Sequence, residues 1–237
     1  RVLFRSATGR TRPGDPRRLV GVVEDITDRR QAYDQRSLVI AELQHRVRNI
    51  FGVVRSVVSR TLSNARPLDE LAAHLKDRID ALGRVHAVIS RSVEDGVDLE
   101  ELVRDELMSL AGADVQVRVR GPAVRLTRLA AESLGLVLHE LGANAVKFGA
   151  LAEHSGRVTV DWNVVDSSRG ASLVLEWQES GVRLMDPQPR RSGFGRELIE
   201  RALPYEMGAA TSLEFARGGV RVVIELPLND KVGHKAP

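Results

Sequence analysis

Apolar residues in the first half of the chain recur every three or four positions, as they do along one face of a helix. Residues 29–62 contain no proline and one glycine, and residues 68–92 repeat the same spacing after Pro67. Two long helices joined by a short turn form an antiparallel hairpin. The stripe residues are Ile40, Leu43, Val47, Ile50, Phe51, Val54, Val57 and Val58, followed by Leu71, Leu75, Ile79, Leu82, Val85, Val88 and Ile89.

The pattern changes beyond residue 98 to alternating apolar and polar positions interspersed with helical stretches. Arg217-Gly218-Gly219 predicts a hairpin between the last two strands. Two further short strands precede the first helix. The sequence therefore predicts an α+β protein with a mixed domain after the helical hairpin. The predicted strands are 2–5, 19–24, 115–121, 157–165, 172–179, 212–216 and 220–228, and the predicted helices of the mixed domain are 98–110, 127–148 and 195–207.

Composition excludes several classes of protein. The chain has 237 residues, 43% hydrophobic and 28% charged, which is typical of a soluble protein. It has no cysteine, so it has no disulfide framework, no thiolate nucleophile and no Cys-ligated metal. No apolar run approaches the ~18 residues that span a bilayer. We therefore expect a cytoplasmic protein, or the cytoplasmic part of one, with no membrane segment in this stretch. Because the chain begins without Met, we also expect it to be a fragment of a longer protein.

The charge balance bears on a nucleic-acid partner. Lys+Arg and Asp+Glu number 35 and 32, a net charge of +3, and the isoelectric point is about 9.7. The high isoelectric point alone suggests nucleic-acid binding. Acidic residues are interspersed almost everywhere, however, and no basic block dominates, so we expect no nucleic-acid partner.

His45 is the first candidate for chemistry. It lies two residues from both Leu43 and Val47, so it projects opposite the apolar stripe, and Asn49 shares its face four residues later. A histidine held in solvent on a rigid helix is a candidate nucleophile. For a single exposed histidine, a surface residue with no role is the commoner alternative.

A second candidate site lies on the predicted helix 127–148. Glu140, Asn144 and Lys147 share one face by i, i+4, i+7 spacing. An amide oxygen suits Mg²⁺, and an ammonium group suits phosphate. The three residues thus favour a metal–phosphate site, although a solvated charged face is the commoner outcome for such a triplet.

Two glycine-containing turns are the third candidate. Gly181 follows a strand, and Gly193 and Gly195 open a helix. Glycine permits close approach of the backbone, and N–H groups at a helix start favour anions. A lone GxG is a weak signal, and the P-loop pattern is absent.

The order of these candidates resembles a known family. ELQHRVRNIFGVVRSV (42–57) is similar to the phospho-acceptor box of histidine kinases, and LVLHELGANAVKFGAL (136–151) is similar to the N box of Bergerat-fold (GHKL) ATP-binding domains. His139 directly before Glu140, with Trp177 two residues before Glu179, resembles HWE-type sensor histidine kinases. GVVEDITDRRQA (21–32) resembles the end of a PAS sensor domain and its exit helix.

The resemblance implies roles for the acceptor and N boxes. His45 would be the phospho-acceptor that attacks the γ-phosphate of ATP. Asn144 would coordinate Mg²⁺, and Lys147 would contact phosphate. Glu140 would hold a metal-bound water or act as a base. With His45 and Glu140, we place Asn49 among the candidate catalytic residues.

The resemblance also implies the adenine end of the site. Glu179, where the wider superfamily has Asp, would accept a hydrogen bond from the adenine amino group, and Gly181 would let the base sit close. Gly193 and Gly195 would border the phosphates. We expect His139 to be structural, and Trp162 and Trp177 to lie in the core. The segment between Gly181 and Gly193 would form the ATP lid, which contains Arg183, Arg190 and Arg191.

Two departures from the family pattern leave points open. Ser180-Gly181-Val182 stands where the family usually shows two glycines and a proline, which affects the shape of that loop. Arg46 follows His45 where the more familiar kinases have an acid, and Glu42, one turn earlier, is the nearest acid on the helix. The base that helps deprotonate His45 is therefore left open.

These expectations give a domain plan. Residues 1–28 would end a PAS sensor and retain part of its sheet. Residues 29–95 would form the dimerisation and phosphotransfer helices, half of a four-helix bundle. Residues 96–237 would form a Bergerat-type α/β sandwich that binds ATP. The helix at 29–40 would carry the state of the sensor to His45. The sensor's ligand is not readable from this sequence, and a flavin is one option.

The expected function is that of a sensor histidine kinase. ATP and Mg²⁺ would support autophosphorylation on His45, and an aspartate of a response-regulator receiver domain would accept the phosphoryl group. A homodimer through the hairpin is the default, since one hairpin alone buries little. A monomer would need the PAS tail or the ATP domain to cover the stripe. The alternatives are a nucleotide-binding scaffold that has lost transfer and a nucleic-acid-binding protein.

Overall fold

The computed structural model falls into two units, Arg1–Ser56 and Val57–Pro237. In the first unit every described residue is helical, in agreement with the predicted first helix. The predicted strands 2–5 and 19–24 lie outside the described residues. The structure describes residues 28–29, 31–33, 36, 47, 51–52, 54–55, 57–59, 61, 68–92, 96–111, 116–167, 170–182, 193–216 and 218–235.

Helix α2 (Leu68–Arg91) is the second helix of the predicted hairpin. The part of its apolar stripe from Leu82 to Ile89 is buried, with Val85 and Val88 fully inaccessible, whereas Leu71 and Leu75 are half-buried and Ile79 is exposed. The stripe packs against helices α3 (Leu99–Ala111) and α4 (Arg128–Phe148) of the same chain. The mixed domain therefore covers the C-terminal part of the α2 stripe within one chain, and the homodimer stays a prediction.

Helix α4 begins at a cap that its sequence provides. The Thr127 side chain accepts a hydrogen bond from the N–H of Ala130, which satisfies one of the unpaired donors at the helix start. The helix then runs without interruption to Phe148 and is followed by the short 3₁₀ helix η1 (Ala150–Ala152). More than half of its residues are buried, so α4 forms the centre of the domain.

A five-stranded sheet has the strand order β2-β4-β5-β7-β6. Strands β2 and β4 are parallel, and the other pairs are antiparallel. Trp162 and Trp177 are buried in the core, as expected. Gly218, with φ of +105°, makes the predicted turn between β6 and β7. The strands are β2 (Val117–Arg120), β4 (Arg157–Ser167), β5 (Gly170–Ser180), β6 (Ala210–Ala216) and β7 (Gly219–Pro227).

A second, three-stranded sheet of order β1-β3-β8 was not predicted. Its strands are β1 (Val97–Asp98), β3 (Val124–Leu126) and β8 (Gly233–Lys235). Strands of two or three residues are too short for an alternating pattern to show in the sequence. The sheet joins three distant segments of the chain and so fixes the starts of α3 and α4.

The predicted helix 195–207 is helical throughout but not one regular helix. It consists of α5 (Phe194–Glu197), a π-helical turn η2 (Leu198–Ala202) and α6 (Leu203–Met207). Gly208 ends it in the left-handed conformation with φ of 67°. The π turn is a local change of hydrogen-bonding pattern that apolar periodicity does not reveal.

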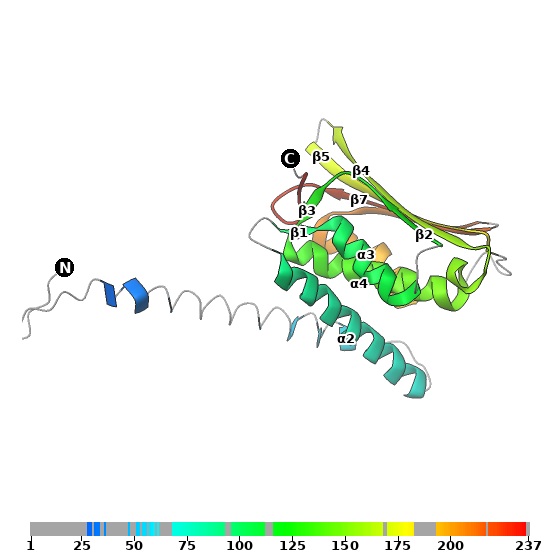
Figure 1. Cartoon of the computed structure of the whole chain (residues 1–237), viewed down its shortest axis with the longest axis horizontal. Helices are drawn as coiled ribbons and strands as arrows, with labels where there is room; N and C mark the ends of the chain where they lie inside the picture. The colour runs from blue at the N-terminus through cyan, green and yellow to red at the C-terminus, as the bar shows by residue number, and fades with distance from the viewer. Residues whose placement is uncertain are drawn as a thin grey trace, which may run out of the picture. The chain divides into compact units, whose positions relative to one another are not determined.

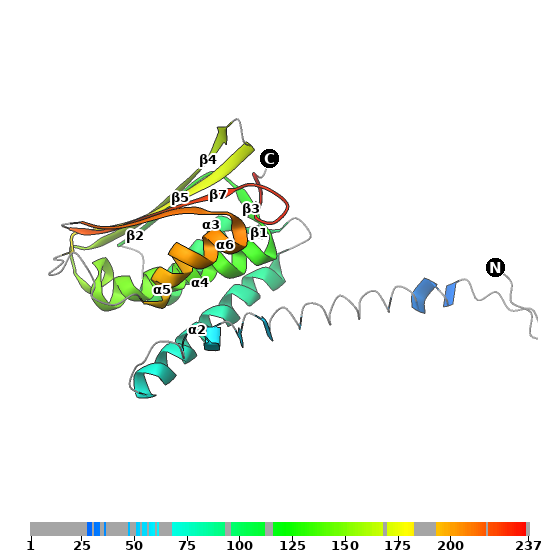
Figure 2. The ribbon, with the colours of Figure 1, turned by 180° about the vertical axis from the view of Figure 1, so that it is seen from behind.

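Figures 1 and 2 show three layers in the second unit. The five-stranded sheet is covered on one face by α3, α4 and the α5–α6 segment, and α2 packs on the outer side of α3 and α4. The structure confirms the predicted α+β class with an α/β sandwich. Among the helices that the structure describes, none is both long enough and apolar enough to cross a membrane.

Helices α2 and α4 pack tightly at Gly135, where an added Cβ would overlap Cγ2 of the buried Val85. Because Val85 is β-branched and stiff, it cannot move aside easily. We predict that Gly135→Ala lowers the free energy of unfolding by about 1–2 kcal/mol, measured by urea denaturation.

Gly83→Ala on α2 is the matched control. A Cβ there meets nothing within 4 Å, so the change should raise the free energy of unfolding by about 0.5–1 kcal/mol. Equal stabilisation by both variants would contradict the close packing of α2 on α4.

Candidate functional site

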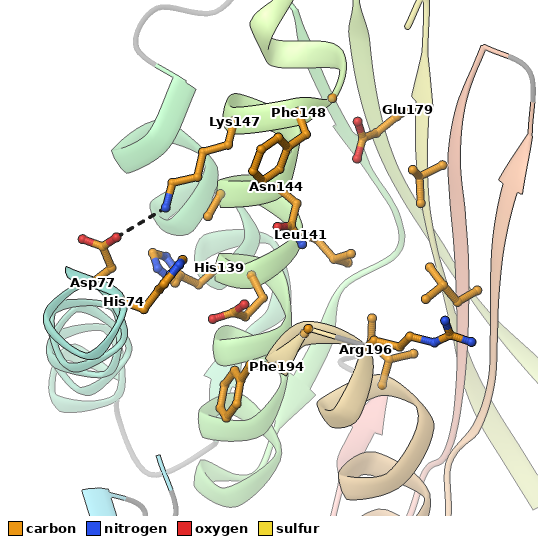
Figure 3. Close-up of a pocket in the computed structure, with 18 of the residues that line it drawn as sticks. His74, Asp77, His139, Leu141, Asn144, Lys147, Phe148, Glu179, Phe194 and Arg196 are labelled. Atoms are coloured by element: carbon orange, nitrogen blue, oxygen red, sulfur yellow. Dashed lines mark ion pairs between the residues drawn. The ribbon is translucent and has the colours of Figure 1, made fainter. Parts of the chain in front are cut away.

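A cavity of about 590 Å³ lies beside α4, within the size range of small-molecule sites. Helix α4 forms one wall, and α2, α5 and strands β5, β6 and β7 of the five-stranded sheet contribute the others. Figure 3 shows His74 and Asp77 entering from α2, Phe194 and Arg196 from α5, and Glu179 from β5. Each layer of the domain thus contributes residues to the lining of the cavity.

The face of α4 predicted from spacing lines this cavity. Glu140, Asn144 and Lys147 all border it, and Asn144 is exposed. Nζ of Lys147 lies 3.7 Å from Oδ2 of Asp77 on α2, as the dashed line in Figure 3 marks. Both side chains of this pair are half exposed, so it adds little stability. A carboxylate, an amide and an ammonium group are therefore brought together on one wall.

Glu179 is a buried carboxylate at the other side of the cavity. Its Oε2 accepts a hydrogen bond of 2.8 Å from the N–H of Ala150, and its Oε1 accepts one of 3.3 Å from Nε1 of Trp177. Burial raises the pKa of Glu179 above its ordinary value, and the two hydrogen bonds offset part of that increase. Each oxygen keeps further acceptor capacity for a ligand.

The predicted glycines divide between two places. Gly193 and Gly195 line the cavity, and a Cβ added at Gly195 would lie 3.0 Å from Cβ of Glu140. Gly181 does not line it. Gly181 has a φ of +76°, which favours glycine. A Cβ added at this position would lie 2.7 Å from the backbone oxygen of Ser155. The approach of Gly181 to a bound base stays a prediction.

His139 is buried where α2, α3 and α4 meet, which agrees with the expected structural role, although it also reaches the cavity wall. Its Nδ1 lies 3.1 Å from Nη2 of Arg84 and 3.4 Å from Oε2 of the buried Glu106. Arginine can only donate, so this contact is a hydrogen bond when Nδ1 is unprotonated. His139 therefore helps to hold α2 and α3 on α4.

Arg78 of α2 is a cavity residue that the sequence analysis missed. Its Nε donates to Oε1 of Glu140 at 2.7 Å, and its Nη1 donates to Oγ1 of Thr61 at 2.7 Å. Its guanidinium carbon lies 3.7 Å from the centre of the Phe194 ring. A signal was present in the sequence, because Arg78 occupies a position of the apolar stripe between Leu75 and Leu82.

The remaining predicted residues lie outside the described residues. They are His45 and Asn49 on the first helix, and Arg183, Arg190 and Arg191 in the predicted lid.

Comparison with known proteins gives a consistent result. The family model of HWE histidine kinases matches residues 42–123. A blue-light-activated histidine kinase of Brucella ovis is 28% identical over 225 residues, which cover 92% of this chain and 46% of the relative. The corresponding protein of Brucella anthropi is 29% identical over 215 residues, covering 90% and 44%. The chain thus spans less than half the length of these curated relatives.

Solved structures agree on the fold. The histidine kinase domain of the Erythrobacter litoralis blue-light activated histidine kinase matches with a TM-score of 0.54 at 21% identity, covering 86% of this chain and 96% of that domain. A longer structure of the same kinase matches with a TM-score of 0.51 at 20% identity, covering 90% and 68%. The fold is therefore like that of a histidine kinase domain. In sequence, residues 42–123 are similar to the HWE histidine kinases.

The raised pKa of Glu179 predicts a pH-dependent difference in stability. The folded state binds a proton at Glu179 more tightly than the unfolded chain does, so this contribution is present at low pH and is lost as the pH rises. The Glu179→Gln variant does not lose stability in this way, because the glutamine side chain does not titrate. Its free energy of unfolding minus that of the wild type should therefore increase from about pH 5 to about pH 8, measured by urea denaturation. The exposed Glu153→Gln variant gives the comparison curve, and a difference that falls with pH would contradict the prediction.

Proposed function

We propose that this chain is the kinase portion of a sensor histidine kinase that phosphorylates itself on His45 with ATP. The observation that carries the proposal is the single cavity bordered by Glu140, Asn144 and Lys147 on one wall and Glu179 on another. The match of residues 42–123 to the HWE histidine kinase model supports it, since histidine kinases use ATP.

ATP fits the two ends of this cavity chemically. At one end, Glu179 has acceptor capacity left for the adenine amino group after its bonds to Trp177 and Ala150. At the other end, the Lys147 ammonium group and the glycine-flanked start of α5 suit the phosphates. Phosphoryl transfer needs mainly positioning and charge neutralisation, and these groups provide both.

The donor set also suits Mg²⁺. The amide oxygen of Asn144 is a hard ligand that opens onto the cavity, and Mg²⁺ typically binds one or two protein oxygens together with phosphates and water. Glu140 lies one turn before it, in position to hold a metal-bound water. When bound, Mg²⁺ would neutralise charge that develops on the phosphates.

The reaction would join the imidazole of His45 to the γ-phosphorus of ATP. The bond between that phosphorus and the β,γ-bridging oxygen breaks, ADP leaves, and the imidazole loses its proton. The phosphoryl group would then pass from His45 to an aspartate carboxylate in a response-regulator receiver domain, which is the proposed partner. Glu140 is one candidate for accepting the imidazole proton, and Glu42 is another.

The rest of the domain plan remains part of the proposal. A PAS sensor would end near residue 28 and act on His45 through the helix that follows. The curated relatives are named for activation by blue light. A light-sensing, flavin-binding sensor is compatible with that name.

In the proposed homodimer the part of the α2 stripe from Leu82 to Ile89 is unavailable, because the mixed domain buries it within the chain. The exposed Ile79 of α2 and the helix that carries His45 would supply the contact. The alternative is the monomer, in which the ATP-binding domain covers the hairpin.

We predict that γ-labelled ATP labels the wild-type chain with an acid-labile adduct and that His45→Ala reduces the label to background, because the nucleophile is lost. His154→Ala, which removes an exposed histidine on a loop, should label like the wild type. Unchanged labelling of His45→Ala, or an acid-stable adduct, would contradict the proposal. Binding of ATP without any labelling of the wild type would favour the nucleotide-binding scaffold.

We further predict that Asn144→Ala weakens Mg²⁺-dependent ATP binding. Loss of one contact to a charged partner costs about 1.5–3 kcal/mol, which corresponds to a roughly 10- to 100-fold higher Kd, measured by calorimetry. The exposed Asn163→Ala on β4 is the matched control. Chelation of Mg²⁺ should weaken binding to the wild type more than binding to Asn144→Ala. An equal effect of chelation on both would exclude Asn144 as a ligand.

A further inference from the structure

Arg78 is a buried cation with three different partners. Only 6% of its side chain is exposed, and its contacts reach Thr61, Glu140 and Phe194. Thr61 is itself buried, and its hydroxyl donates to the carbonyl oxygen of Val57. Taking a guanidinium group out of water is expensive unless it is paired and hydrogen-bonded, so a buried arginine is weak evidence for stability as such. Its placement therefore calls for another explanation.

The contact with Arg78 occupies only one of the two carboxylate oxygens of Glu140. Oε1 accepts from Nε of Arg78 at 2.7 Å, whereas Oε2 has no hydrogen bond with the part of the chain that the structure describes. Oε2 lies 3.6 Å from the position of a Cβ added at Gly195, and both residues border the cavity. Arg78 thus fixes one oxygen and leaves the other available on the side of α5.

The contact with Phe194 fixes a second wall. The Phe194 ring is buried under the guanidinium group of Arg78, and Phe194 lies between the two cavity glycines Gly193 and Gly195. A cation placed over an aromatic ring is attracted to it, most strongly where water is excluded. One side chain of α2 therefore touches both α4 and the start of α5.

We propose that Arg78 is a positioning residue for phosphoryl transfer: from helix α2 it orients the carboxylate of Glu140 and anchors the start of α5. The inference rests on the proposed kinase function and adds to it a residue outside the sequence boxes. Because Arg78 lies on the hairpin helix, the position of α2 sets the geometry of the reaction site. Through the contact with Thr61, the preceding helix contributes to the same geometry.

The second α2–α4 contact at the cavity does not share this role. The Asp77–Lys147 pair is half exposed and its atoms are 3.7 Å apart, so water screens it. The Arg78–Glu140 pair is shorter and largely buried. The planar guanidinium group of Arg78 also stacks and donates in two directions, which the point charge of a lysine cannot do in the same way.

The test uses Arg78→Met in the full 237-residue chain, since methionine keeps an unbranched apolar stem over Phe194 without the charge. Misplaced reacting groups typically lower rates by 10- to 100-fold, so we expect the kcat of autophosphorylation to fall by about that factor. The KM for ATP and the binding of a fluorescent ATP analogue should stay near the wild-type values. Arg78→Lys should recover part of the lost kcat. Arg91→Met, on the exposed face of the same helix, is the matched control and should leave kcat unchanged.

A double-mutant cycle tests whether Arg78 acts through Glu140. If it does, Arg78→Met lowers the single-turnover rate by a smaller factor in the Glu140→Gln background than in the wild type, and the remaining loss is its separate effect through Phe194. Additive losses would overturn the proposal. A higher rate in Arg78→Met would also overturn it, because the contact would then block the site. So would a parallel loss of kcat, nucleotide binding and melting temperature, which indicates a purely structural role.

The wild type separates this inference from the proposed function. If the wild type forms no phosphohistidine, the proposed function fails. If it does, and Arg78→Met matches it, only the role of Arg78 fails.

Discussion

Helix α4 lies between the five-stranded sheet and α2, with α3 beside it, and this constraint governs the rest of the domain. A polar side chain on such a helix must either meet a partner or open onto a cavity, since an unpaired buried polar group is costly. Asn144 opens onto the cavity. The other polar residues in the second half of α4 meet side chains of α2.

The polar contacts between α4 and α2 follow one another along the two helices, which run antiparallel. His139 contacts Arg84 at 3.1 Å and Glu140 contacts Arg78 at 2.7 Å. Lys147 contacts Asp77 at 3.7 Å, nearest the C-terminal end of α4. Buried ion pairs contribute little net stability, whereas the α2 stripe removes much apolar surface from water. We therefore assign the driving force for docking to the stripe, and the register between α2 and α4 to the polar contacts.

The sequence predicted those parts of the fold that depend on local periodicity. The helices α2, α3 and α4 and the strands of the larger sheet follow from spacing, and so does the shared face of Glu140, Asn144 and Lys147. A periodic stripe shows that a face is buried but does not identify the surface that covers it. The stripe of α2 predicted a dimer contact for this reason, and its C-terminal part is covered by α3 and α4 within one chain. The dimer itself stays a prediction.

Arg78 shows a second limit of sequence reasoning. Its place in an apolar stripe marks it as unusual, but its three partners lie on three other segments and become neighbours only in the folded chain. The three-stranded sheet was not predicted for the same reason, because each of its short strands pairs only with segments that are distant in the sequence. Non-local contacts of this kind carry no periodic signal.

The pairing of Trp177 with Glu179 illustrates a motif that folding explains directly. Residues two apart on a strand share a face, so both side chains point into the core from β5, where Trp177 is fully buried. The indole offers a large apolar surface and a single N–H donor, which reaches Oε1 of Glu179. A Cβ at position 149 would overlap Oε2, so Gly149 is required for the carboxylate to meet the N–H of Ala150. Tryptophan, glutamate and glycine thus form one interdependent unit, in which the core residue orients the polar group that the proposed adenine contact needs.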